Sequence, residues 1–154
     1  MRLTAFTDYS LRVLIYLAAR PAQRATIAEI AAAYDIKQNH LTKVVHFLAR
    51  QGWLATVRGR GGGLQLARPA LDIAVGAVVR QTEGADLPAE CFDDVGNTCP
   101  ITRVCALKQV LHEAADAFHA VLDGYTLADL VQRPRALNGL LFGPRAHAAD
   151  RLPP

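Results

Sequence analysis

The sequence predicts a mainly α-helical fold that contains one small β-hairpin and a long helix near its C-terminal end. Three observations support this fold class. Short amphipathic segments fill residues 7–51, two strand-like runs flank a glycine-rich stretch at 58–63, and a heptad-like apolar pattern begins at Leu107. A chain of 154 residues, 51% hydrophobic and 20% charged, can bury one core and carry one helical extension.

The first two helices follow from apolar spacing and from capping residues. From residue 7 to residue 19 the apolar positions repeat with the spacing of one helical face, and Pro21 ends this helix. Thr26 and Glu29 have the spacing of a capping box, in which a hydroxyl and a carboxylate satisfy free backbone amides at a helix start. A short second helix is therefore expected to close near Tyr34.

A third helix is predicted from residue 38 to Gln51, where Gly52 supplies a left-handed C-terminal cap. Its apolar side chains share one face, and its polar side chains share the other. Two helices joined by a tight turn, the second with polar groups facing outward, have the layout of a helix-turn-helix. An ordinary helical hairpin with a solvated face is the alternative. The candidate DNA-contacting residues of the third helix are Gln38, Asn39, His40, Thr42 and Lys43.

Residues 53–57 and 64–67 have the pattern of two β-strands around the stretch 58–63. The glycines of that stretch permit a tight turn, and its tip carries Arg58 and Arg60. A hairpin directly after a recognition helix is the wing of a winged helix-turn-helix domain, and guanidinium groups at its tip can enter a minor groove of DNA. The stretch lacks the Lys-Ser/Thr ending of a nucleotide-binding loop, which argues against phosphate binding there.

Charge is divided unevenly along the chain. Residues 1–68 hold ten Lys and Arg against three Asp and Glu, a net +7, whereas residues 69–154 hold seven against eleven, a net −4. A basic half attracts polyanions such as nucleic acid, although a solvated basic surface is the alternative. No uncharged apolar run reaches the roughly 18 residues of a membrane span and no secretory segment is evident, so a cytoplasmic protein is expected.

Cys91, Cys99 and Cys105 lie in a stretch whose Asp, Gly, Asn and Pro content predicts a loop. An odd number of cysteines without a secretory segment argues against a disulfide framework. Structural zinc is poorly matched, because the spacings lack the short cysteine pairs of zinc knuckles. Thiolates on a curved loop suit an iron-sulfur cluster and leave its fourth ligand open. His112 and His119 lie on the following helix and are expected to face solvent or a helix contact.

From Leu107 to Leu122 the apolar residues form a coiled-coil-like seam. Such a helix would most simply pair with its copy, giving a two-fold dimer that reads a palindromic operator, and an intramolecular core helix is the alternative. An apolar helix over residues 73–81 packs against the first domain. The predicted organisation is a winged-helix DNA-binding domain at 1–83, a cysteine loop at 84–106, a dimerisation helix and short terminal helix at 107–132, and a flexible tail at 133–154.

The chain resembles the Rrf-two family of iron-sulfur winged-helix regulators over about residues 1–132. The features that carry the resemblance are FTDY at 6–9, NHLTKVV at 39–45, RGRGGG at 58–63 and the three loop cysteines. Two further strings, NTCPI at 97–101 and YTLADL at 125–130, are similar to those of the nitric-oxide-sensing repressors in that family. The strings are specific in combination, since each alone is short.

This resemblance implies that Cys91, Cys99 and Cys105 ligate an iron-sulfur cluster and that Asp8 of the other subunit completes it. A four-iron four-sulfur cluster is favoured over a two-iron two-sulfur cluster. From the residues alone, Asp8 in the first helical turn is equally explained by the helix dipole. Related regulators of cluster biosynthesis would carry a His shortly after the last cysteine, and the residues at 106–108 are Ala, Leu and Lys here.

Two features depart from the family pattern. The gap between the first two cysteines is longer than in several relatives, which bears on the geometry of a cluster. Lys37 stands where a capping Ser or Thr is expected, and we expect Asp35 and Gln38 to form a substitute capping pair.

Together these features predict a homodimeric, DNA-binding transcriptional repressor rather than an enzyme. As the resemblance implies, it would bind DNA with an intact cluster and release it when nitric oxide attacks the cluster. The alternatives are a different iron-sulfur or redox transcription regulator, a zinc- or thiol-based sensor, and a cysteine-dependent redox enzyme. The enzyme is disfavoured because the chain lacks a Cys-x-x-Cys pair and an evident catalytic base.

Overall fold

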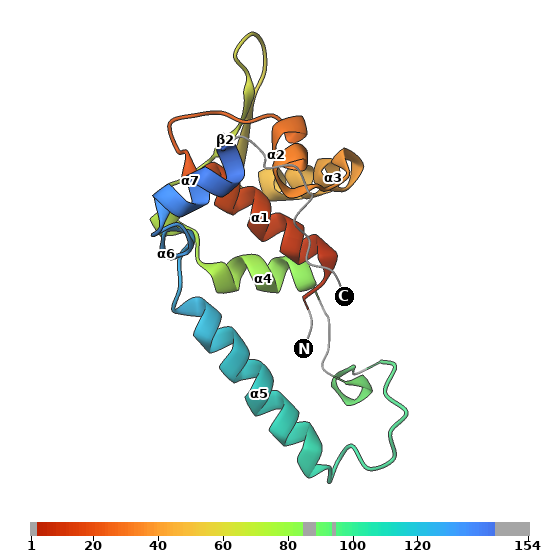
Figure 1. Cartoon of the computed structure of the whole chain (residues 1–154). Helices are drawn as coiled ribbons and strands as arrows, with labels where there is room; N and C mark the ends of the chain where they lie inside the picture. Colours follow the sequence, from red (N-terminus) through yellow and green to blue (C-terminus); the bar gives the residue numbers. More distant parts are fainter. Residues whose placement is uncertain (1–2, 85–88, 94, 144–154) are drawn as a thin grey trace, which may run out of the picture.

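The computed structural model describes residues 3–84, 89–93 and 95–143. It confirms a mainly α-helical fold with one antiparallel hairpin, which projects from one end of the molecule while a long helix extends from the other (Figure 1). The elements are α1 (Ala5–Ala19), α2 (Ile27–Tyr34), α3 (Gln38–Arg50), β1 (Leu54–Val57), β2 (Gly63–Leu66), the 3-10 turn η1 (Ala70–Asp72), α4 (Val75–Glu83), the 3-10 turn η2 (Glu90–Phe92), α5 (Ala106–Asp123), α6 (Leu127–Leu130) and α7 (Pro134–Phe142).

Of the two caps predicted for α2 and α3, one forms and the other does not. The Thr26 hydroxyl accepts a hydrogen bond from the backbone N–H of Glu29 at 3.2 Å, and the Glu29 carboxylate accepts one from the backbone N–H of Thr26 at 2.6 Å, so the capping box of α2 is confirmed. The predicted pair of Asp35 and Gln38 is wrong. Asp35 instead ends α2 in the left-handed conformation at φ 55°, and the N-cap residue of α3, Lys37, provides no side-chain cap in the described structure.

The core gathers around α1, which lies between α3, α4 and the C-terminal helices (Figure 1). Val13 and Leu14 of α1 are fully buried, and Trp53 before the hairpin is 5% exposed. Leu127 of α6 joins this core, so the chain returns to the N-terminal domain after α5. Other large side chains that are fully buried come from α2, α3 and the stretch before α4, and they are Ile30, Leu41, Leu48 and Ile73.

A tight joint fastens the C-terminal end of α5 to α4. The backbone N–H of Val75 donates to the carbonyl of Tyr125 at 2.9 Å, and that of Leu127 donates to the carbonyl of Ile73 at 2.8 Å. The Arg80 guanidinium forms a two-pronged ion pair with the Asp123 carboxylate, and this pairing lowers the pKa of Asp123. The joint orients α5 relative to the N-terminal domain.

The C-terminal stretch differs from the flexible tail expected from residue 133. Pro134–Phe142 forms α7, which begins with a proline in its first turn, where the missing N–H has no helical partner to lose. The ring of Phe142 packs against Tyr16 at 4.8 Å between centroids, and the Arg20 guanidinium lies 3.6 Å from its centroid. Aromatic burial on α1 therefore holds this segment, while residues 144–154 lie outside the described residues.

We expect Gly76→Ala to lower the free energy of unfolding by about 1–3 kcal/mol, because an added methyl group would overpack the joint. A Cβ at Gly76 would overlap the Asp123 carboxylate and lie 3.0 Å from its backbone nitrogen. Urea denaturation measures the change. Gly139→Ala in α7 is the matched control, since a Cβ there meets no atom within 4 Å and should not destabilise the fold. Equal stability of the two variants would contradict this account of the joint.

We expect Glu29→Gln to reduce the loss of stability in acid. Hydrogen bonds from the backbone and side chain of Thr26 hold the pKa of Glu29 below its ordinary value. A carboxylate whose pKa is lowered in the folded state adds stability above its unfolded pKa, and this contribution disappears as pH falls through the folded pKa. Urea titrations from neutral to acidic pH test this. The prediction would be disproved if the free energy of unfolding fell equally with pH in both proteins.

Candidate DNA interface and cysteine segment

Helix α3 presents all of its candidate DNA-contacting side chains to solvent. The exposed residues are Gln38, Asn39, His40, Thr42 and Lys43. The opposite face of α3 is buried through its apolar residues, so packing fixes which side points outward. The Thr42 hydroxyl donates to the backbone carbonyl of Gln38 at 3.0 Å, which sets the rotamer of one candidate side chain.

Helix α1 supports α3 through two aromatic contacts. The Tyr9 ring stacks on His40 at 6.1 Å between centroids and 25° between planes. Phe6 meets Phe47 edge to face at 5.3 Å. Tyr9 was absent from the residues that the sequence singled out for DNA binding. It could not be found from spacing, because the contact joins two helices that only tertiary packing brings together.

The hairpin forms where the sequence placed it, with Leu54 paired to Leu66 and Val57 paired to Gly63. Its tip turns through Gly59 and Gly61, whose φ angles of 95° and 77° disfavour any residue with a side chain. Arg58 and Arg60 are exposed on this tip. The wing therefore offers two guanidinium groups beyond the end of the sheet, on the domain that also carries α3.

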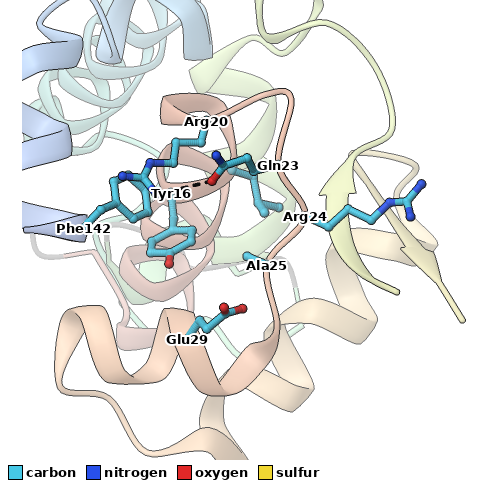
Figure 2. Close-up of a pocket in the computed structure, with 8 residues that line it drawn as sticks. Tyr16, Arg20, Gln23, Arg24, Ala25, Glu29 and Phe142 are labelled. Carbon is cyan, nitrogen blue, oxygen red and sulfur yellow. Dashed lines mark hydrogen bonds between the residues drawn. The ribbon is translucent and has the colours of Figure 1, made fainter. Parts of the chain in front are cut away.

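A third chain segment anchors the hairpin close to its turn. Ala25, in the connection from α1 to α2, exchanges backbone hydrogen bonds with Leu64 at 3.1 and 2.7 Å. Leu64 is 5% exposed and so fixes its strand to the core. Next to this bridge, Arg24 reaches across to the hairpin, whereas Arg20 covers Phe142 at the far side of a small pocket (Figure 2).

The three cysteines are free thiols, each partly exposed, at three different kinds of position. Cys91 lies in η2, Cys99 directly precedes the turn at 100–104, and Cys105 is the N-terminal cap of α5. This segment lies at the end of α5 remote from the wing (Figure 1).

Two polar side chains, Glu90 and Asn97, make hydrogen bonds within the cysteine segment, which is described at residues 89–93 and 95–105. The sequence did not indicate these contacts. The Glu90 carboxylate accepts hydrogen bonds from the backbone N–H and hydroxyl of Thr98, both at 2.6 Å, which lowers the pKa of Glu90. Asn97 accepts from the backbone N–H of Cys99 at 3.1 Å. The Glu90 contact ties the flank of Cys91 to the flank of Cys99.

The candidate ligands do not meet in one chain. Over residues 3–84, 89–93 and 95–143, no three His, Cys, Asp or Glu side chains gather in a metal-binding arrangement. Asp8 instead forms a two-pronged ion pair with Arg12, with contacts of 2.8 and 3.0 Å. His112 Nδ1 lies 2.9 Å from the Asp116 carboxylate, and its ring stacks on Phe92. The donor set of three free thiols suits a soft-metal centre, as the composition of the loop predicts.

Helix α5 has no buried residue in the described chain. Its apolar side chains Leu107, Val110 and Val121 are 61, 58 and 63% exposed. An intramolecular core helix, the alternative to a dimerisation helix, would bury such a face. Among the described helices, none is both long and apolar enough to cross a membrane.

Comparisons with known proteins agree with these features. A model of the Rrf2 family, described as an iron-dependent transcriptional regulator, matches residues 3–133. The HTH-type transcriptional regulator NsrR of Bacillus subtilis (strain 168) is 51% identical over 142 residues, which are 92% of this chain and 97% of that protein. NsrR of Geobacillus kaustophilus (strain HTA426) is 48% identical with the same coverage.

A solved structure confirms the fold class. The crystal structure of Staphylococcus aureus CymR aligns with a TM-score of 0.67 and 29% identity, over 84% of this chain and 97% of that chain. The mainly helical domain with its hairpin thus has the arrangement of known regulators rather than of an enzyme. By family model, sequence identity and fold, the chain belongs to the Rrf2 family of iron-dependent transcriptional regulators.

Proposed function

We propose that this chain is a homodimeric transcriptional repressor that holds an iron-sulfur cluster and loses DNA affinity in response to nitric oxide. The observation that carries the proposal is that one chain has three free thiols near the N-terminal end of α5 and an exposed polar face on α3, with α5 joined to α4 at its other end. The extent of identity to proteins named NsrR supports the same function.

The DNA-binding surface combines α3 with the wing. Amide, imidazole and amine groups on α3 suit base edges and phosphates in a major groove. Arg58 and Arg60 suit an adjacent minor groove, where an A·T tract concentrates negative potential. The basic balance of residues 1–68 favours this approach to DNA over other surfaces of the chain.

Pairing of α5 with its copy would bury the apolar seam that one chain leaves exposed. A two-fold dimer presents two copies of α3 and therefore fits a palindromic operator. The joint at Arg80 and Asp123 would transmit any change in the pairing of α5 to the N-terminal domains, because it leaves little room for α5 to pivot.

The cluster ligands in this proposal are Cys91, Cys99 and Cys105, with Asp8 of the partner subunit as the fourth. The bound cluster supplies iron that reacts with nitric oxide. A carboxylate is a weaker ligand for such iron than a thiolate. In the structure the Asp8 carboxylate is paired with Arg12. Ligation of the cluster would compete with this ion pair, so the position of the Asp8 side chain would depend on whether the cluster is bound. A four-iron four-sulfur cluster is the form we favour.

Contacts at the start of α1 connect the C-terminal end of α4 to α3. Glu83, the last residue of α4, accepts hydrogen bonds from the backbone N–H and the hydroxyl of Thr4 at 2.9 and 3.2 Å. Thr4 caps α1, and α1 carries the aromatic contacts to α3. A shift of the C-terminal end of α4 can therefore bias the position of the recognition helix. Cluster binding would favour DNA binding provided that the cluster binds the DNA-competent state more tightly.

Anaerobic purification should yield a brown protein that contains iron and sulfide. Nitric oxide should bleach its visible absorbance and reduce its affinity for a duplex selected by the protein from a random DNA pool. Cys99→Ala should lack most of the iron, whereas Asp8→Ala should retain a less stable cluster, because only one weaker ligand is lost.

The same preparation separates the competing functions. A colourless protein with stoichiometric zinc would replace this proposal with a zinc sensor. A cluster that responds to cellular redox state or iron supply, and leaves DNA binding unaffected by nitric oxide, would indicate another iron-sulfur regulator.

We expect Arg60→Ala to weaken binding to the selected duplex by about 1–3 kcal/mol if Arg60 enters a groove. Fluorescence anisotropy at matched salt measures the affinity. Arg135→Ala, which removes an exposed guanidinium from α7, is the control for loss of charge. Unchanged affinity of the Arg60 variant would remove the wing from the DNA interface.

A further inference from the structure

Arg24 holds the tip of the wing from outside the hairpin. Its Nε donates to the side-chain carbonyl of Gln65 at 3.0 Å, and its Nη1 donates to the backbone carbonyl of Gly61 at 3.0 Å. Figure 2 shows the Arg24 side chain leaving the connection between α1 and α2 in the direction of the hairpin. One side chain thus contacts both β2 and the turn that carries Arg60.

The turn has few other restraints. The backbone pairing of the strands ends at Val57 and Gly63, and the bridge from Ala25 reaches only Leu64. Beyond these pairs, the N–H of Gly62 donates to the carbonyl of Gly59 at 2.9 Å within the turn itself. In the described part of the chain, Arg24 provides the side-chain hydrogen bond that connects this turn to the body of the domain.

The contacts of Arg24 constrain geometry without neutralising its charge. Both acceptors are uncharged carbonyl oxygens, and the described structure contains no salt bridge from Arg24. The guanidinium is planar, and its N–H donors point in fixed directions. Because two of these donors bind the hairpin, they restrict both the distance and the angle between the wing and the end of α1.

We infer that Arg24 is a positioning residue for DNA binding, which holds the wing at the angle where Arg58 and Arg60 reach the minor groove. This inference rests on the proposed role of the wing. A preordered turn loses less conformational freedom on binding than a free one, so the hydrogen bonds of Arg24 raise affinity without direct contact to DNA. The competing explanation is that Arg24 binds a phosphate itself.

The partner residue Gln65 separates these explanations. Gln65→Ala removes an acceptor of Arg24 and keeps every positive charge of the surface. Loss of DNA affinity in this variant follows if Arg24 acts through the wing. If Arg24 binds a phosphate directly, removing its intramolecular acceptor should leave affinity unchanged or increase it.

The experiment measures anisotropy on the selected duplex at several salt concentrations. The variants are Arg24→Ala, Gln65→Ala and the double variant of Arg58 and Arg60 to Ala, together with their combinations. Arg20→Ala is the control, because Arg20 has the same charge and lies near Arg24 but covers Phe142 instead of the wing. Thermal unfolding of each variant confirms that it remains folded.

We expect Arg24→Ala to weaken binding roughly three- to tenfold, as the loss of one or two hydrogen bonds implies. Gln65→Ala should reproduce part of this loss without changing the slope of log affinity against log salt. Neither substitution should weaken binding further once Arg58 and Arg60 are absent, since the wing then has no groove contact to position.

Three results would overturn the inference. First, Arg24→Ala could reduce DNA affinity by the same factor whether or not Arg58 and Arg60 are present, and also reduce the slope of log affinity against log salt. This result would mean that Arg24 binds a phosphate. Second, unchanged DNA affinity in Gln65→Ala would show that the contact between Arg24 and the hairpin does not contribute to DNA binding. Full affinity in the double variant of Arg58 and Arg60 would refute the proposed wing interface itself, and the positioning role with it.

Discussion

Burial of helix α1 is the constraint on which the rest of the structure depends. Val13 and Leu14 are fully buried, and residues around them contact α3, α4, the hairpin and both C-terminal helices. Each functional element is thereby oriented against one common support. The edge-to-face and stacked contacts of Phe6 and Tyr9 extend this support to the recognition helix. A shift of α1 along its axis could not leave α3 in place.

The proposed DNA-binding surface and the cysteines lie at opposite ends of the molecule. The wing lies at one end and the cysteine segment at the other, with α1, α4 and α5 between them (Figure 1). Two side-chain contacts link the helices between these ends. Glu83 joins the end of α4 to the start of α1, and Arg80 joins α4 to the end of α5. Both connections depend on charged groups outside the apolar core, so they can change without unfolding that core.

Two features of one chain favour the proposed pairing with a second copy. An 18-residue helix without a buried side chain would leave its apolar seam in water, at a cost proportional to the exposed area. The three thiols would leave a cluster without its fourth ligand. Asp8 of the same chain does not join them, because it pairs with Arg12. The proposed dimer satisfies both needs at once, because it covers α5 and supplies a carboxylate from the partner subunit.

The sequence by itself determined the helices and the hairpin from α1 to α6 and the chemical character of their surfaces, but it did not reveal α7. Periodicity placed the helices, Thr26 and Glu29 marked a helix start, and glycines around Arg60 marked the wing, because these signals depend on neighbours within a few residues. Only the tertiary structure decided what holds these elements. Arg24 with Gly61, Arg80 with Asp123 and Phe142 with Tyr16 join residues far apart in the chain. The distance between them is set by packing of the whole core, which no local pattern encodes.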